Sequence, residues 1–291
     1  EAYYGFQIDL NTSFTGEDSL DISIDAGNSG GAATEFDLNG AVTDSGSQTT
    51  TDVLNVDGVS YTFPVGGATV MVGDNTDGSA LFSTACVYGG PSNTLDDCGN
   101  VNAGITGAGT AFGISYDFDN GFTAAAGYAG AGSSTAGLLT EEGLDSYGFN
   151  VAYTGDTYGV SVTYGSTEAT TTTEDTYTAL NAYWAPEGNF PSISVGYEIG
   201  DDGSEVAAED GLTSYFVGLQ FEEVGPGTLG AALGPKISTP EDATEQLMYE
   251  LYYSYPVNDG MTITPLIYHQ ENSAVGVPDQ TGLMVKTSFS F

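Results

Sequence analysis

Carboxylate side chains at alternate positions are the groups of this sequence best suited to chemistry. In residues 19–27, SLDISIDAG, Asp21 and Asp25 share one face of an extended chain, and leucine and isoleucine occupy the other. Carboxylates placed around a narrow aqueous space add negative potential, which favours cations over anions. The pattern therefore indicates selection of cations, provided that the carboxylate faces surround a common lumen.

Catalytic and metal-binding motifs are weak by comparison. His269 is the single histidine, and the serines, threonines and Glu271 near it reflect ordinary composition. The segment DNTDG at 74–78 lacks the ligand spacing of a calcium loop. We therefore expect no enzymatic activity, no cofactor and no metal-binding site.

The two cysteines lie close together in the chain. Cys86 and Cys98 bracket the glycine-containing segment CVYGGPSNTLDDC, within the longest irregular stretch of the sequence, residues 74–110. In an oxidising compartment, such a pair is expected to form a local disulfide that pins a loop. A metal or redox site would need further ligands nearby.

The chain is strongly acidic. Among its 291 residues are 40 Asp and Glu, and its two basic side chains are Lys236 and Lys286, giving a formal charge of -38. Such a chain repels nucleic acid and anionic headgroups, so we exclude both as partners. Adaptation to high salt is a competing explanation of the acidity, because a short Debye length makes acidic surfaces tolerable. The 19 Tyr and 14 Phe distinguish the chain from disordered acidic sequences.

Alternation of apolar and polar residues recurs along most of the chain and predicts about fifteen antiparallel strands. Short turns such as TGED, DNG and PEGNFP alternate with longer polar links near residues 28–51, 130–145, 166–175, 200–212, 235–245 and 270–281. No apolar run reaches about 18 residues, which excludes a transmembrane helix. The sequence thus predicts one all-β domain over residues 1–291, with tight turns at one end and long loops at the other.

Tyrosines bracket the apolar faces of several predicted strands. They are Tyr147, Tyr153, Tyr158, Tyr164, Tyr249, Tyr253 and Tyr255. A tyrosine suits the boundary between hydrocarbon and headgroups, and transmembrane barrels carry such aromatic girdles at both interfaces. The last predicted strand ends on Phe291, similar to the C-terminal signal that the outer-membrane assembly machinery reads. These features favour a transmembrane barrel over a soluble barrel or sandwich.

Four segments carry a family resemblance. They are NTSFTGEDSLDISIDAGN at 11–28, YTFPVGGATVMVG at 61–73, GTAFGISYDFDNGFTAAAGY at 109–128, and the terminal strand. In this order they resemble the cyanobacterial major outer-membrane porins, also called iron-uptake porins, which are related to the OprB-type carbohydrate-selective porins. The resemblance implies a trimeric barrel of 16 strands with short periplasmic turns, long outer loops and one long loop folded into the pore.

The chain departs from the family pattern in two ways. Family members have a peptidoglycan-binding segment and a first strand upstream of the position where this sequence begins, so the resemblance implies contact with peptidoglycan only through that missing part. The absence of a cleavable signal at Glu1 indicates a mature or truncated chain. The missing first strand leaves barrel closure against the terminal strand open. Where family members often have Lys or Arg, this chain has Glu17, Asp21 and Asp25. The lumen is therefore expected to be acidic.

If the apolar faces point to lipid, the opposite faces line the pore. The pore-lining candidates are Asp9, Asp21, Asp25, Asp117, Glu198, Gln220, Glu222, Glu250 and Lys286. For any one of them the alternative is an ordinary solvated strand face. Residues 74–110 are the candidate constriction loop; folded inward, they would bring Asp96 and Asp97 near the narrowest point, whereas an outward surface loop would not.

These observations predict an outer-membrane porin of the Gram-negative type, and the family resemblance implies cyanobacterial character. We expect passive diffusion of small hydrophilic solutes and inorganic ions with cation preference, including iron or other metal ions as the family resemblance implies. Expected partners are outer-membrane lipid and lipopolysaccharide, the permeating solutes and cations, and two further copies in a homotrimer. The alternative is a secreted or surface-attached acidic β-rich adhesin whose apolar faces form a dry core.

Overall fold

The computed structural model describes most of the chain. The described residues are 4–27, 54–92, 95, 97–106, 109–130, 137, 139–140, 143–170, 173–203, 211–235, 239–240, 243–271 and 278–290. Asp96, Lys236 and Phe291, which the sequence singled out, lie outside these ranges. Within the described ranges the structure contains no helix with the length and apolar character needed to cross a membrane.

The regular elements of the described residues are all β-strands. In chain order they are β1 (Gly5–Thr12), β2 (Ser19–Gly27), β3 (Asn55–Val65), β4 (Ala68–Asp74), β5 (Thr110–Asp117), β6 (Phe122–Gly130), β7 (Asp145–Thr154), β8 (Tyr158–Thr170), β9 (Thr173–Trp184), β10 (Ser192–Asp201), β11 (Leu212–Val224), β12 (Gly227–Pro235), β13 (Thr239–Pro240), β14 (Leu247–Asn258), β15 (Met261–Gln270) and β16 (Gln280–Phe289). The predicted all-β class is confirmed.

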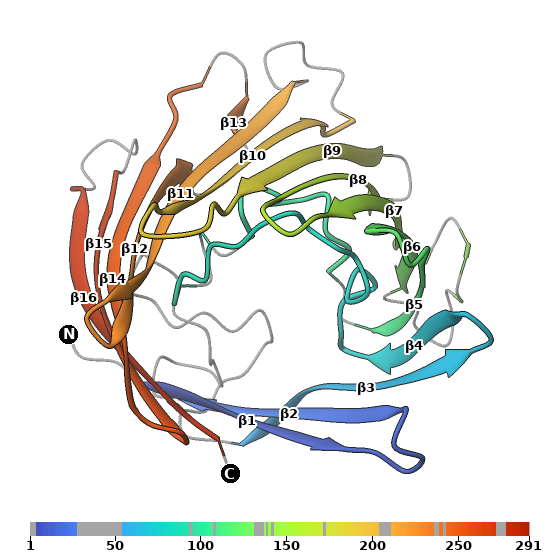
Figure 1. The fold of residues 1–291 in the computed structure, drawn as a ribbon. Coiled ribbons are helices and arrows are strands. Elements are labelled where there is room, and N and C mark those ends of the chain that lie inside the picture. Colours follow the sequence, from blue (N-terminus) through green and yellow to red (C-terminus); the bar gives the residue numbers. More distant parts are fainter. Residues whose placement is uncertain are drawn as a thin grey trace.

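One antiparallel sheet contains all the strands. Each strand pairs with its neighbours in chain order, except that the short β13 pairs with β11 and β12 pairs with β14. The sheet curls into a barrel-shaped wall (Figure 1). Its two edge strands are β1 and β16. Successive strands along the path from β1 to β16 alternate in direction, and the path contains 15 strands, so β1 and β16 run in the same direction. No hydrogen-bonded pairing joins β1 to β16 within the described residues.

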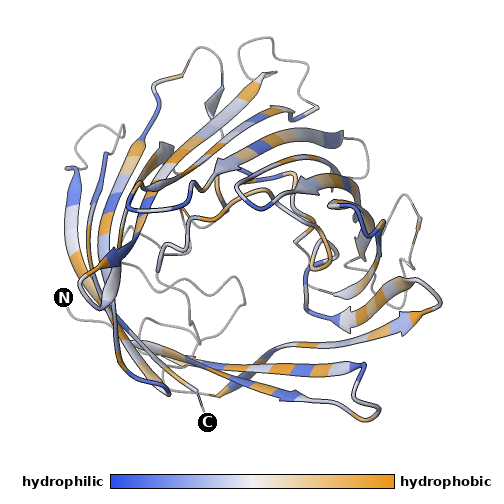
Figure 2. Ribbon diagram, viewed as in Figure 1, coloured by the Kyte–Doolittle hydropathy of each residue, from blue (hydrophilic) through white to orange (hydrophobic). Residues whose placement is uncertain are grey.

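Side chains alternate between the two faces of this wall, as extended strands require. On β7 and β8, Phe149, Val151, Val160 and Val162 lie outward, each about half exposed, and intervening polar residues are buried on the inner side. Figure 2 shows the alternation of apolar and polar positions along the strands. An adhesin with a dry apolar core would bury these outward faces. The structure exposes them instead, as a barrel in contact with lipid would.

The girdle tyrosines lie near both ends of the strands. Tyr153 and Tyr158 meet near the short-turn end with ring centroids 5.6 Å apart, and Tyr253 and Tyr255 lie at the same end of β14. At the long-loop end, Tyr147 donates to Glu174 at 3.3 Å and Tyr249 to Glu271 at 3.5 Å. Tyr164 is nearer the middle of the wall, opposite Phe149.

The turn between β1 and β2 is organised by one carboxylate. Asp18 accepts hydrogen bonds from Ser13 Oγ at 2.6 Å, from Thr15 Oγ1 and N at 2.7 Å, and from Tyr61 OH at 2.7 Å. These donors favour the charged form, so they hold the pKa of Asp18 far below its ordinary value. The TSFTGED segment thus folds around its last residue, which fixes the turn to β3 as well.

Candidate pore constriction

The long segment between β4 and β5 folds into the barrel. In Figure 1 it runs along the inner side of the wall formed by β7 to β11. Its hydrogen bonds reach residues on β7, β8, β9, β10, β11 and β14. The prediction of an inward-folded loop is therefore confirmed, and the outward surface loop is wrong.

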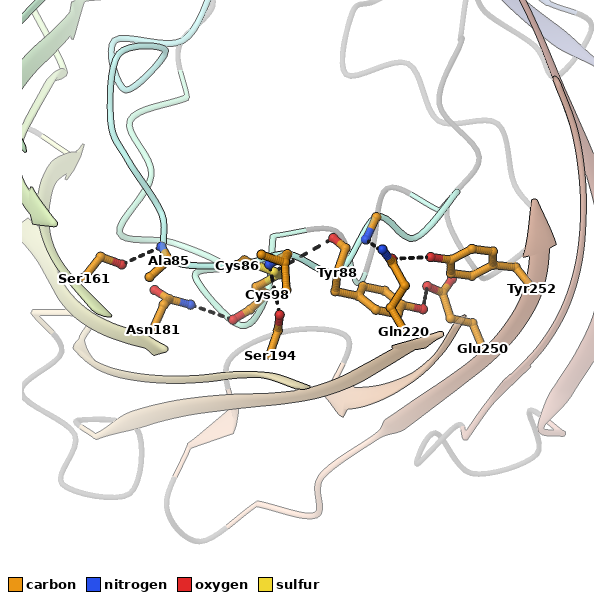
Figure 3. The surroundings of a disulfide bond; sticks show 12 residues. Ala85, Cys86, Tyr88, Cys98, Ser161, Asn181, Ser194, Gln220, Glu250 and Tyr252 are labelled. Carbon is orange, nitrogen blue, oxygen red and sulfur yellow. Dashed lines mark hydrogen bonds between the residues drawn. A yellow bond between two sulfur atoms is a disulfide. The ribbon is translucent and has the colours of Figure 1, made fainter. Parts of the chain in front are cut away.

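Alternate backbone N–H groups fasten the first part of this loop to the wall. The donors and side-chain acceptors are Ser83 to Asn150 on β7 (2.9 Å), Ala85 to Ser161 on β8 (2.9 Å), Val87 to Ser194 on β10 (3.0 Å) and Gly89 to Gln220 on β11 (2.8 Å). Figure 3 shows part of this series. Every second residue bonds because an extended chain turns its N–H groups to alternate sides. The wall therefore supplies the partners that a neighbouring strand would otherwise provide.

Two wall carboxylates accept hydrogen bonds from the loop as well. Glu250 on β14 accepts from Tyr88 OH and, at 2.6 Å, from Ser92 Oγ. Glu198 on β10 accepts from the backbone N–H groups of Asn102 and Ala103, each at 2.8 Å, and from Asn102 Nδ2 at 2.9 Å. Glu198 is 0% exposed and Glu250 4%. Buried carboxylates persist only when donors replace the lost water, and the loop provides those donors.

A disulfide joins the two passes of the loop over the wall. Cys86 of the first pass is bonded to Cys98 of the second, as the spacing of the cysteines predicts (Figure 3). The Cys98 carbonyl accepts from Asn181 Nδ2 on β9 at 2.8 Å. Both passes are thus tied to the wall and to each other.

Glycines on the inner face of the wall make room for the loop. Gly113, Gly127, Gly148 and Gly165 pair directly across β5 to β8. A Cβ atom at Gly127 would overlap the carbonyl oxygen of Gly78, and one at Gly196 on β10 would overlap that of Cys98. We call this set of five residues the glycine trough. At Gly127, Gly165 and Gly196 the loop backbone lies so close to the wall that only glycine allows the approach.

Apolar side chains complete the contact between loop and wall. Tyr88 packs edge-on against Phe216 of β11 and Tyr252 of β14, with ring centroids 5.3 Å and 5.8 Å apart. Leu95 and Cys98 belong to the same buried cluster, together with Met248 and Leu266 of the wall. The loop is therefore held by an apolar core on the β11 to β15 side and by polar contacts elsewhere.

The pore-lining candidates fall into two groups. Glu198, Gln220 and Glu250 lie beneath the loop and hold it, so they do not meet the open lumen. Asp25 is likewise buried, at 5% exposure. The exposed candidates are Asp9, Asp117, Glu222, Lys286 and, in the loop, Asp97; Asp21 is half-buried.

The exposed and half-buried candidates lie at different levels between the short-turn end and the long-loop end of the wall. Asp117 lies at the short-turn end, where it accepts the N–H of Asp119 at 2.8 Å. Asp9 accepts from Ser23 Oγ at 2.8 Å. Asp21 lines a polar hollow of about 160 Å³ together with Asp57 and Asp77. Within the described residues, no group of three or more His, Cys, Asp or Glu side chains is placed to hold a metal ion.

Sequence reasoning missed the residues that receive the loop. These are Asn150, Ser161, Asn181 and Ser194, and the five residues of the glycine trough. A signal for the trough exists in the sequence, because several predicted strands carry a glycine on their polar face near mid-strand, as in AFGISYDF, SYGFNVAY and SVGYEIG. Isolated glycines within strands mark close approach of another backbone.

This chain is similar to known proteins in its structure but not in its sequence. No family model matches the chain, and no curated protein sequence matches it. Two mutants of the porin from Rhodopseudomonas blastica superpose with TM-scores of 0.54 and 0.53, each at 11% identity, over 99% of this chain and 90% of theirs. A structure described under asymmetric conductivity of engineered proteins superposes over the same shares with a TM-score of 0.52 and 12% identity. The chain therefore has the β-barrel fold of these bacterial porins.

Proposed function

We propose that this protein is an outer-membrane channel for passive diffusion of small hydrophilic solutes and inorganic ions, with a preference for cations. The observation that carries the proposal is the inward loop, held to the inner wall by hydrogen bonds from alternate residues and by two wall carboxylates. A loop fixed across a barrel narrows the lumen to a constriction while leaving a polar path beside it. The outward apolar faces provide the surface for lipid.

The cation preference rests on the sign of the charges. In the described part of the chain, Lys286 is the one Lys or Arg side chain, and Asp9, Asp21 and Asp97 are at least partly exposed. Carboxylates beside a narrow aqueous path raise the local cation concentration and exclude anions. Weak attraction at several positions lets ions enter and leave, and the structure offers scattered carboxylates that suit this behaviour.

The membrane and the oligomer belong to the same proposal. The fold and the two tyrosine girdles support a location in a Gram-negative outer membrane, in contact with lipid and lipopolysaccharide. Outward-facing small residues such as Ala124 and Ala126 on β6 would permit close contact between copies, which supports a homotrimer. The sequence resemblance adds cyanobacterial origin and iron or other metal ions as cargo.

A planar-bilayer measurement tests the channel and its selectivity together. The purified protein, inserted from detergent, should produce discrete conductance steps, and a salt gradient should produce a reversal potential of the cation-selective sign. A potential of zero or of the opposite sign would refute the cation preference while leaving the channel intact. Failure to conduct, together with free solubility in buffer without detergent, would refute the channel itself.

A further inference from the structure

The disulfide of the inward loop is accessible from one side only. It joins Cys86 to Cys98 (Figure 3). Cys98 is 0% exposed and belongs to the buried apolar cluster that also contains Leu95 and Phe216. Cys86 is partly exposed and packs against that cluster from its border. A dissolved reagent can therefore reach Cys86 in the folded loop, whereas Cys98 is enclosed.

The accessible side of Cys86 borders a hollow of about 210 Å³. Phe82, Thr84 and Asp97 are among the other residues that line it. Every described residue of its lining belongs to the loop, residues 74–110, and none belongs to a strand of the wall. A hollow between loop and wall would include wall residues, so this hollow opens on the lumen side of the loop. Reagents dissolved in the lumen therefore have access to Cys86.

The backbone around both cysteines is held without the help of the sulfur atoms. The backbone N–H groups of the residues before and after Cys86 donate to Ser161 and Ser194 of the wall, at 2.9 Å and 3.0 Å. The carbonyl of Cys98 accepts from Asn181 at 2.8 Å. These bonds remain when the disulfide opens, so the two sulfur atoms stay close to each other. The bond can therefore open and form again in the folded protein.

We propose that Cys86 is a thiol-exchange site on the lumen side of the loop, and that it takes small thiols that are uncharged or cationic. The thiolate of the small molecule attacks Cys86 Sγ and forms a new S–S bond. The bond to Cys98 Sγ breaks, and its electron pair goes to Cys98 Sγ, which takes up a proton from water. The attacking sulfur is oxidised and the Cys98 sulfur is reduced, so one disulfide replaces another. Attack on Cys98 is blocked, because the apolar cluster encloses it.

The charge and size of the thiol follow from the surroundings of Cys86. The formal charge of the chain is -38 with both lysines counted, and Asp77 and Asp97 are among the residues that line the hollow. Such a chain repels anionic reagents and attracts cationic ones. A protein cavity of about 150 Å³ holds a benzene molecule, so the hollow has room for a group as small as 2-aminoethyl.

The group left on Cys86 changes the space available to permeating ions. It occupies the hollow on the lumen side of the loop, so it takes volume from the aqueous path beside the loop. The conductance should therefore fall when the adduct forms and recover when a reductant removes it. This consequence rests on the proposed channel function, whereas the exchange at Cys86 does not.

Single-cysteine variants test the site in a planar bilayer. Cys98→Ser leaves the Cys86 thiol beside the hollow, and the matched control Cys86→Ser leaves the enclosed Cys98 thiol. The cationic reagent 2-aminoethyl methanethiosulfonate should lower the conductance of Cys98→Ser in discrete steps that dithiothreitol reverses, and it should not affect Cys86→Ser. The anionic 2-sulfonatoethyl reagent should react more slowly with Cys98→Ser. The difference in rate should narrow near 1 M salt, where the Debye length is about 3 Å.

The unmodified protein provides a second test that does not depend on the folding of a variant. The folded protein in detergent is incubated with cysteamine, and thiols released by the exchange are blocked with N-ethylmaleimide after denaturation. Chymotrypsin then separates the two cysteines by cleavage after Tyr88 or Leu95. Mass spectrometry should find the 2-aminoethylthio group on Cys86 and the maleimide on Cys98.

The outcomes distinguish the exchange site from the channel. Modification of Cys86 in both tests, with the fall in conductance, supports the inference. Attachment to Cys98, an equal response of the two single-cysteine variants, or no exchange in the unmodified protein overturns it. Faster reaction of the anionic reagent overturns the assigned charge, and unchanged conductance in labelled Cys98→Ser overturns the position on the lumen side. Absence of conductance in the unmodified protein counts against the channel, and the mass spectrum still decides the exchange.

Discussion

The backbone N–H of Ala85 donates a hydrogen bond of 2.9 Å to the hydroxyl of Ser161, 76 positions later in the chain. The bond joins a residue of the inward loop to the inner face of β8. Together with the corresponding bonds to β7, β10 and β11, it fixes the path of the loop along the wall, although the loop is not itself a strand of the sheet. The width of the lumen therefore depends on small polar side chains of the wall.

The glycine trough predicts a narrower pore when it is filled. Gly196→Val places a side chain where the Cys98 carbonyl now lies, so the second pass of the loop must move away from the wall and into the lumen. We expect the single-channel conductance and the polymer cut-off both to fall, because the close-packed contact cannot absorb the added volume and the displaced backbone must occupy space in the lumen. The matched control is Val195→Leu, which adds volume to the neighbouring outward residue. Equal conductance in both variants and the unmodified protein would contradict the close approach at Gly196.

We predict that the open-channel current noise is lower when the disulfide is formed than when it is reduced. Reduction, or the pair of substitutions Cys86→Ser and Cys98→Ser, removes the covalent tie between the two passes while leaving their hydrogen bonds to the wall. A disulfide closing a loop of this length contributes about 2–4 kcal/mol to the state that contains it. Open-channel current noise should therefore rise on reduction and fall on reoxidation, with the mean conductance nearly unchanged. Noise that does not respond to reductant would show that the wall contacts hold the loop without the bridge.

Asp18 predicts a loss of stability in acid. Its folded-state pKa is depressed by the donors Ser13, Tyr61 and Thr15, so its contribution to stability is present above the ordinary Asp pKa, near 4, and is lost as the pH falls further. Asp18→Asn removes that contribution at neutral pH and removes this part of the pH dependence. The temperature at which heated samples change mobility on a gel should fall in the variant at pH 7, and the difference should shrink at pH 3. An equal difference at both values would rule out the carboxylate charge as the cause.

We predict that an arginine on the outward face of the wall destabilises the protein by an amount that depends on its depth in the membrane. Val162 lies near mid-strand of β8 on the exposed apolar face, and Tyr158 begins the same strand at the short-turn end. Val162→Arg should lower the free energy of unfolding in lipid by about 2–4 kcal/mol, and Tyr158→Arg by about 1 kcal/mol or less. Urea titration of the protein in lipid vesicles measures both. Similar costs at the two positions would be inconsistent with a hydrocarbon layer around the wall.

The period of two in the sequence was enough to predict the wall. Apolar residues such as Phe149 and Val162 recur with strand spacing, and the structure exposes them on one face. One connection was predicted wrongly: residues 166–175 were expected to form a long polar link, but β8 runs to Thr170 and β9 begins at Thr173. Threonine favours strands, and a polar strand beyond the apolar belt shows no alternation of hydropathy.

The path of the loop could not be predicted from periodicity. Glu198, Gln220 and Glu250 have the parity of lumen residues, and the structure does place them on the inner face. Their burial depends on a segment about 100 positions or more away in the chain, which reaches them through single hydrogen bonds that leave no repeat in the sequence. Parity therefore identifies the inner face, whereas only the fold shows which part of that face is covered.

The glycine trough has a consequence for how this protein can vary. Substitutions at Gly127, Gly165 and Gly196 meet the loop backbone, and those at Gly148 meet the side chain of Ile105 in the loop, whereas neighbouring outward positions such as Phe149 and Val195 are exposed. A library in which every strand residue is replaced, selected for growth on a solute that must pass the channel, should therefore tolerate apolar replacements at these outward positions but resist replacement at the glycines that the loop covers. The positions that resist replacement would trace the outline of the loop on the barrel wall, so that genetics alone could map the constriction.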